Sequence, residues 1–145
     1  MKWKGGVSSI LSHVLKTLSE TTVKFGLAKT SLTKILELGS NKLRVMENFQ
    51  NLTNLQELWL GRNRIKAVNF CGLKCIKKIS LQINHLTSMA GFEGCIALEE
   101  LYLSHNGITK MEGLSSLANL RILDVSSNKL TTVDDILNLT RLEDL

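Results

Sequence analysis

The sequence predicts an α/β solenoid, in which short strands from successive coils lie side by side and form a parallel sheet. Two observations support this: asparagines recur every 21 or 22 residues, and the same apolar pattern precedes each of them. The pattern LxxLxLxxNxL is complete four times, and a fifth copy lacks only its first apolar residue, where Thr33 stands. A period of about 20–29 residues with this pattern is the signature of the leucine-rich repeat. The recurring asparagines are Asn41, Asn63, Asn84, Asn106 and Asn128.

Each copy of the pattern is expected to form a short strand on the concave side. In the second copy, Leu58 and Leu60 stand two residues apart, so both side chains point inward. Glu57, Trp59 and Gly61 then point outward. The same spacing in the other copies predicts parallel strands centred near residues 36–38, 58–60, 79–81, 101–103 and 123–125.

The asparagines are expected to turn inward where the chain leaves each strand. An asparagine side chain offers two donors and an acceptor, so it can bond backbone groups that the turn would leave unpaired. A buried polar group without a partner would cost about 1–3 kcal/mol. The fixed period therefore predicts a structural ladder of buried asparagines, one in each coil.

The return half of each coil repeats its apolar residues at a spacing of three. After Asn106 these residues are Ile108, Met111, Leu114 and Leu117. This spacing suits 3₁₀ turns or a single short helix rather than a long α-helix, and it predicts the convex side. The second coil is one residue short between Val68 and Leu73, which predicts a tighter convex turn with the strand register kept.

Residues 1–34 are expected to form a non-repeat segment, and residues 35–145 about five repeats with the start of a sixth. Apolar residues from Val7 to Leu18 fall on one face of a helix. This segment could be an amphipathic helix that caps the open end of the first coil. It could also be a lysine-rich targeting segment, or an unstructured or foreign extension. The repeat region is interpreted as a longer solenoid shortened at both ends.

The basic excess lies outside the repeats. Residues 1–34 hold six lysines and one acidic residue, whereas residues 35–145 hold twelve basic and twelve acidic residues. A solenoid that binds nucleic acid should carry its basic residues on the repeat surface, so we expect no nucleic-acid partner. No apolar run reaches about eighteen residues, so we expect no membrane association. The chain is expected to be a monomer.

Cysteine and histidine residues indicate neither a metal site nor catalysis. Cys71 and Cys75 have no histidine close in sequence, and Cys95 takes a core position that leucine fills in other coils. His85 and His105 follow strands without a third catalytic group, so we expect no catalytic residues, metal or cofactor. The few cysteines indicate a reducing compartment, the nucleus or the cytoplasm or both.

The outward positions of the strands are the predicted working surface. The central outward column is Glu37, Trp59, Ser80, Tyr102 and Asp124, and the flanking column is Ile35, Glu57, Lys78, Glu100, Ile122 and Asp144. Tryptophan and tyrosine are enriched among the residues that dominate protein interfaces, and acidic residues around them suit a basic partner. We therefore expect a protein-binding concave face.

Three stretches, 36–65, 72–89 and 97–114, resemble the leucine-rich-repeat regulatory subunits of protein phosphatase 1, and a plant member in particular. The resemblance extends to letters outside the core, such as LGSNKLRVMEN, and covers residues 35–145. It implies a non-enzymatic subunit that binds the phosphatase catalytic subunit through its concave face and restrains or redirects it. The contact positions it implies are Glu37, Trp59, Tyr102, Asp124 and Asp144. Two alternatives are a general leucine-rich-repeat scaffold for another protein and an inactive truncated fragment.

Overall fold

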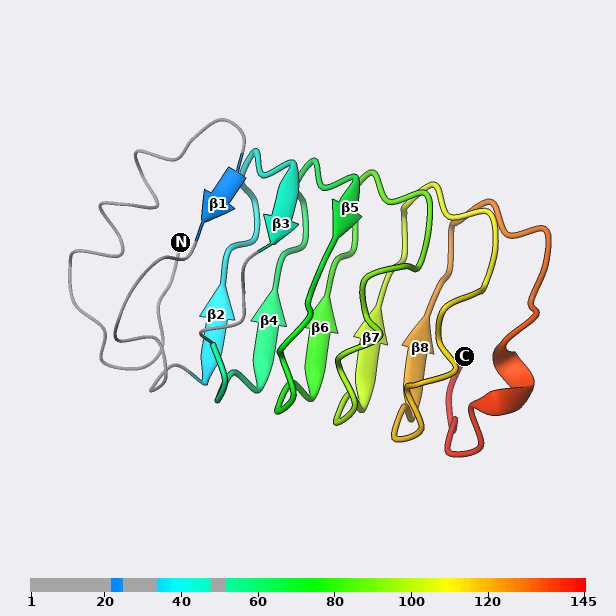
Figure 1. The fold of residues 1–145 in the computed structure, drawn as a ribbon. Helices are drawn as coiled ribbons and strands as arrows, with labels where there is room; N and C mark the ends of the chain where they lie inside the picture. Colours follow the sequence, from blue (N-terminus) through cyan, green and yellow to red (C-terminus); the bar gives the residue numbers. More distant parts are fainter. Residues whose placement is uncertain (1–21, 25–33, 48–51) are drawn as a thin grey trace.

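The computed structural model describes residues 22–24, 34–47 and 52–145, which wind into a row of stacked coils (Figure 1). The predicted cap helix lies outside these residues. The strands are β1 (Thr22–Lys24), β2 (Ile35–Glu37), β3 (Val45–Glu47), β4 (Glu57–Trp59), β5 (Ala67–Val68), β6 (Lys78–Ser80), β7 (Glu100–Tyr102) and β8 (Ile122–Asp124). A 3₁₀ helix, η2, spans Ile136–Asn138.

The larger sheet contains one strand from each coil, in the order β2-β4-β6-β7-β8, and every neighbouring pair is parallel. The fold class predicted from the sequence is therefore confirmed. The centre of each strand falls within the predicted range, at residues 36, 58, 79, 101 and 123. The hydrogen bonding continues past the strand ends, since the N–H of Leu38 donates to the carbonyl of Trp59 at 2.8 Å.

A second sheet, in the order β1-β3-β5, was not predicted. It lies beyond the C-terminal ends of the larger sheet's strands (Figure 1), and β3 and β5 follow the turns at Asn41 and Asn63. Its register pairs Thr22 with Val45 and Val45 with Ala67. β1 belongs to the segment 1–34, so coil stacking reaches into a part of the chain where the apolar pattern is absent.

The rest of the return half is a series of turns closed by i to i+3 hydrogen bonds, as the spacing of three predicts. The N–H of Cys95 donates to the carbonyl of Phe92 at 2.8 Å, and that of Leu98 donates to Cys95 at 3.0 Å. Each turn brings the next apolar side chain back to the interior. Among the described residues, one stretch continues into a 3₁₀ helix, η2 in the last coil.

The core is one continuous cluster of aliphatic side chains, completed by aromatic and sulfur-containing residues. Phe70 and Phe92 from neighbouring coils meet edge to face, with ring centroids 5.7 Å apart. Cys95 is fully buried, and this burial raises the pKa of its thiol to about 12. Cys95 therefore acts as a small hydrophobic residue, as its position among leucines predicts.

The short second coil keeps the strand register, with Leu58 opposite Ile79, because the residue is lost from the convex side. Val68 and Phe70 are only two apart, whereas the equivalent Met89 and Phe92 are three apart. The loss brings the carbonyl of Val68 against Gly91, which has φ +101°, and a Cβ at Gly91 would collide with that carbonyl. The tighter turn therefore requires glycine in the next coil.

Candidate functional site

The asparagine that follows each of β4, β6, β7 and β8 ties two coils together at the edge of the concave face. Oδ1 of Asn63 accepts the N–H of Leu43 at 3.1 Å, and Nδ2 donates to the carbonyls of Leu38 and Leu60, both at 2.9 Å. Three further asparagines accept a backbone N–H from the preceding coil in the same way. The N–H of Ile65 donates to Oδ1 of Asn84 at 3.0 Å, that of Leu86 to Asn106 at 2.9 Å, and that of Ile108 to Asn128 at 3.1 Å.

Burial differs along this asparagine ladder. Asn63 and Asn84 are 6% and 7% exposed, whereas Asn41, Asn106 and Asn128 are half-buried. Nδ2 of Asn41 donates to the carbonyls of its own turn, those of Leu38 and Gly39. The residue before each asparagine has a positive φ between 54° and 58°, in the left-handed region. These residues are Ser40, Arg62, Ile83, His105 and Ser127.

The sheet brings four of the five candidate contact residues into one column. The register pairs Glu37 with Trp59 and Tyr102 with Asp124, and Ser80 on β6 lies between Trp59 and Tyr102. The fifth candidate, Asp144, pairs with Ile122 and therefore lies in the flanking column. The four candidates in the central column are half-buried, and Asp144 is exposed.

Two of the candidates belong to a hydrogen-bonded group that we call the Lys78 cluster: Glu57, Trp59, Lys78, Glu100 and Tyr102. Nε1 of Trp59 donates to Oε2 of Glu57 at 3.1 Å, and the phenol of Tyr102 donates to Oε2 of Glu100 at 2.9 Å. Nζ of Lys78 lies 2.7 Å from the same oxygen of Glu100 and 5.8 Å from the centroid of the Trp59 ring. The Trp59 and Tyr102 side chains are therefore held in place before any partner binds.

Hydrogen bonds within the Lys78 cluster stabilise the charged forms of Lys78 and Glu100 and the neutral form of Tyr102. The hydrogen bond to Glu100 raises the pKa of Lys78. Burial alone would raise the pKa of Glu100, but hydrogen bonds from Lys78 and Tyr102 outweigh it, so this pKa is lowered. Burial, followed by the hydrogen bond to Glu100, raises the pKa of Tyr102. Near neutral pH the cluster therefore holds an ammonium, a carboxylate and a neutral phenol.

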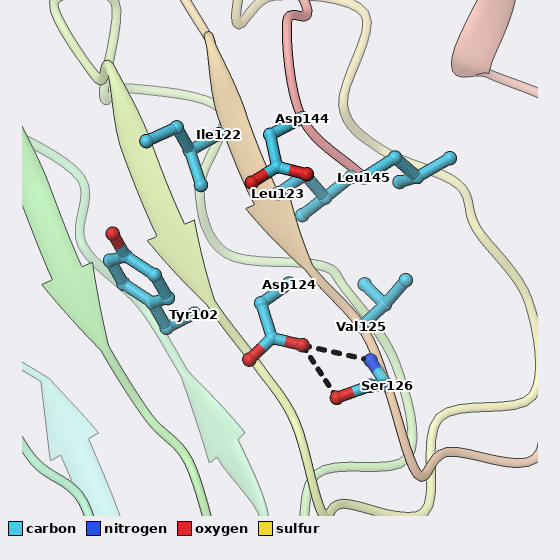
Figure 2. Close-up of a pocket in the computed structure, with 8 residues that line it drawn as sticks. All are labelled: Tyr102, Ile122, Leu123, Asp124, Val125, Ser126, Asp144 and Leu145. Atoms are coloured by element: carbon cyan, nitrogen blue, oxygen red, sulfur yellow. Dashed lines mark hydrogen bonds between the residues drawn. The ribbon is translucent and has the colours of Figure 1, made fainter.

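A second polar group surrounds Asp124 at the C-terminal side of the sheet. Oδ1 of Asp124 accepts the backbone N–H of Ser126 at 3.0 Å and its hydroxyl at 2.7 Å (Figure 2), and Oδ2 accepts Nε2 of Gln82 at 3.2 Å. Burial alone would raise the pKa of Asp124, but these hydrogen bonds outweigh it and lower the pKa. Asp124 is therefore held as a carboxylate on the concave face.

A hollow of about 500 Å³ adjoins Asp124 and brings three candidates together. Figure 2 shows its lining, which combines carboxylates with aliphatic side chains. Trp59 and Glu37 are not among the lining residues. The hollow is lined by Tyr102, Ile122, Leu123, Asp124, Val125, Ser126, Asp144 and Leu145.

Negative charge is concentrated on the concave face. Its outward positions hold five carboxylates and one ammonium, that of Lys78, while residues 35–145 as a whole are neutral. The remaining surface of the repeats is correspondingly basic. The five carboxylates are Glu37, Glu57, Glu100, Asp124 and Asp144. This separation favours a basic partner on the concave face.

Glu57, Lys78 and Glu100 were placed in the flanking column of the predicted surface, but not among the candidate contact residues, and the bonds of Glu57 to Trp59 and of Glu100 to Tyr102 and Lys78 were not predicted. The signal was present, since Glu57, Lys78 and Glu100 alternate in charge at aligned positions of three neighbouring coils. Opposite charges at paired positions of adjacent strands attract one another.

The residues that the structure describes contain neither a cluster suited to a metal ion nor a helix able to span a membrane. No group of three or more His, Cys, Asp or Glu side chains there could hold a metal ion. None of the helices within those ranges has the length and apolar character needed to span a bilayer. Cys71, Cys75, His85 and His105 are all exposed.

Comparison with known proteins supports the repeat architecture. A model of the family described as leucine-rich repeats (2 copies) matches residues 96–138. A curated Arabidopsis thaliana protein, the protein phosphatase 1 regulatory inhibitor subunit PPP1R7 homolog, is 81% identical over 47 residues. This match covers 32% of the present chain and 14% of that protein. The chain thus matches a small part of this relative's length.

Solved structures with the same fold include two proteins of Listeria monocytogenes. Internalin C2 superimposes with a TM-score of 0.73 and 26% identity, covering 79% of this chain and 52% of that chain. The functional domain of InlJ superimposes with a TM-score of 0.67 and 27% identity, covering 80% of this chain and 26% of that chain. The chain is a leucine-rich-repeat scaffold, an architecture whose extended concave surfaces serve in binding.

Proposed function

We propose that this chain is a non-enzymatic regulatory subunit that binds the catalytic subunit of protein phosphatase 1 through its concave face. The observation that carries the proposal is the 81% identity, over 47 residues, to a protein named as a regulatory inhibitor subunit of that phosphatase. Identity at this level extends beyond the core positions that any leucine-rich repeat must share. The proposal includes residence in the nucleus or the cytoplasm.

The chemistry of the concave face supports this role. Trp59 and Tyr102 lie on the outward side of β4 and β7, where their rings fill no part of the core. Large aromatic side chains that are already oriented lose little conformational entropy when they bind. Carboxylates surround them, so a basic surface on the phosphatase would be attracted and oriented before contact.

Trp59→Ala tests the proposal at its central residue. We expect the affinity for the phosphatase catalytic subunit to fall by about 2 kcal/mol or more, because an aromatic anchor is removed from the interface. The free energy of unfolding should change by about 1 kcal/mol or less, since the Trp59 side chain lies outside the core and its contacts to Glu57 and Lys78 are on the solvent-facing side of the sheet. Isothermal titration calorimetry measures the first quantity, and urea unfolding followed by circular dichroism measures the second.

Leu137→Ala is the matched control, because Leu137 is a large apolar residue that is 88% exposed and belongs to η2, outside the concave sheet. It should leave the affinity unchanged. Equal affinity of the parent and Trp59→Ala would remove Trp59 from the site. A well-folded parent that does not bind the phosphatase would favour a scaffold for another protein. A non-cooperative thermal melt of the parent would favour an inactive fragment.

A further inference from the structure

We propose that Glu57, Trp59, Glu100 and Tyr102 form a binding site for an arginine side chain of a protein partner, and that Lys78 occupies this site in the unbound chain. The proposal rests on the proposed function in taking the concave face as the protein-binding surface. It adds the chemistry by which that face receives a partner residue, and it assigns Lys78 as an internal competitor.

Lys78 already shows that the site accepts a cation. Its ammonium contacts the carboxylate of Glu100 at 2.7 Å and lies 5.8 Å from the centre of the Trp59 ring. An aromatic face and a carboxylate on opposite sides of a cation are the two groups that proteins use to bind one. Lys78 is also the single cation at the outward positions of the larger sheet's described strands, all of whose other charged residues are acidic.

Lys78 can leave the site without disturbing the core. It lies on the outward side of β6, and its side chain keeps 28% of its surface exposed. The flexible four-carbon stem of a lysine lets the ammonium move into water. Ile79, the next residue, points inward and is fully buried, so the strand stays anchored when Lys78 moves.

An arginine would bind the vacated site better than Lys78 does. Its planar guanidinium can stack on the indole of Trp59 and donate two parallel hydrogen bonds to a carboxylate, whereas an ammonium is a point charge. Glu57 and Glu100 both belong to the flanking column, one on each side of Lys78. Displacing Lys78 also frees one acceptor position on the Glu100 oxygen, which Tyr102 continues to bind. The partner must nevertheless compete with Lys78, so this residue lowers the affinity for every basic ligand of the site.

Lys78→Gln tests the competition directly, with a capped Gly-Arg-Gly-Arg-Gly peptide as the probe. Trp3→Phe in every protein leaves Trp59 as the sole tryptophan, so its fluorescence reports binding. We expect Lys78→Gln to bind the peptide about five- to tenfold more tightly than the parent, the factor expected when a weak ion pair and a cation–π contact no longer compete. A peptide with citrulline in place of both arginines should bind neither protein.

Lys77→Gln is the matched control for charge. Lys77 precedes Lys78, and its Nζ lies 3.3 Å from Oε1 of Glu99 in the next coil, so it makes a comparable ion pair. Its side chain is 57% exposed and lies outside the Lys78 cluster. It should bind the peptide as the parent does. Equal affinities of Lys78→Gln and Lys77→Gln, or equal binding of the arginine and citrulline peptides, would overturn the proposal. Circular dichroism confirms that each variant is folded.

A parallel titration with the phosphatase catalytic subunit separates this inference from the proposed function. Tighter binding by Lys78→Gln than by Lys77→Gln supports both. Weaker binding by Lys78→Gln would mean that Lys78 itself contacts the phosphatase, which overturns the inference and leaves the proposed function standing. The expected peptide result without phosphatase binding would overturn the proposed function and support the arginine site.

Discussion

In the interior of neighbouring coils, Leu58 pairs with Ile79, and both are aliphatic. On the concave face, the next residue of each strand is Trp59 in one coil and Ser80 in the other. The asparagine ladder is repeated as strictly as the aliphatic residues are. Stacking imposes this regularity, because each coil must fit the surface of the next at native packing density. The concave face contacts solvent and is free of that requirement, so its residues differ from coil to coil.

This difference predicts that substitutions in the interior act mainly on stability, whereas substitutions on the concave face act mainly on binding. The expected effects on the free energy of unfolding can therefore be ranked by how tightly two coils approach at each position. A face residue that destabilised the chain as much as an interior one would contradict the comparison.

Gly91→Ala should have the largest effect on the free energy of unfolding, a loss of about 3 kcal/mol or more, because strain at positive φ adds to a collision with the Val68 carbonyl. Gly113→Ala is the matched variant, since Gly113 also has a positive φ, but its Cβ would lie 3.5 Å from the carbonyl of Met89. It should lose only about 1–2 kcal/mol, the strain alone. Urea unfolding measures both losses, and equal losses would show that the short coil imposes no special contact.

Asn84→Ala should have the next largest effect, a loss of about 1–3 kcal/mol, because it leaves the N–H of Ile65 and the carbonyls of Leu60 and Leu81 without this partner. Asn84→Asp should be comparably destabilising, since a buried carboxylate would face the two carbonyls that now accept hydrogen bonds. Thermal melts of both variants measure the loss. A parent-like melting temperature for either would show that the ladder contributes little to stability.

Glu100→Gln should have the smallest effect, below about 1 kcal/mol, because solvent screens an ion pair on the face. Its pH dependence is the distinguishing result. The pKa of Glu100 is lowered in the folded chain from its ordinary value of 4.5. Its contribution to stability is therefore present above pH 4.5 and is lost as the pH falls through the folded pKa. Unfolding free energies of parent and variant should differ at pH 7 and converge in acid; a constant difference would contradict the assignment.

The larger sheet could be predicted from the sequence because the pattern LxxLxLxxNxL shows both the length of the repeat and the alternation of inward and outward residues in each strand. Leu58 and Leu60 point inward and Glu57 and Trp59 outward, as their spacing of two predicts. The smaller sheet could not be predicted in the same way. No repeated apolar pattern marks its strands: β1 lies where the pattern is absent, and β5 contains only Ala67 and Val68.

The candidate surface was only partly predictable. Side-chain type identified Trp59 and Tyr102 as exposed aromatics without a role in the core. The pairing of Lys78 with Glu100 depends instead on two side chains from different coils. The one-residue deletion in the second coil shortens the spacing between Glu57 and Lys78 to 21, whereas Lys78 and Glu100 keep the usual spacing of 22. The alternating charge of these aligned positions is visible in the sequence, whereas the bonds that Trp59 and Tyr102 make to Glu57 and Glu100 are not.

Each hydrogen bond from a backbone N–H to a ladder asparagine runs from one coil to the next, so that N–H is sensitive to the opening of the following coil. The amide of Ile65 belongs to the coil of Asn63, yet its acceptor is Asn84 in the following coil. That amide can exchange its hydrogen with water when the following coil opens, even while its own coil stays closed. Amide hydrogen exchange rates at Ile65, Leu86 and Ile108 would therefore report the opening of successive coils. Each amide reports on the coil that follows its own.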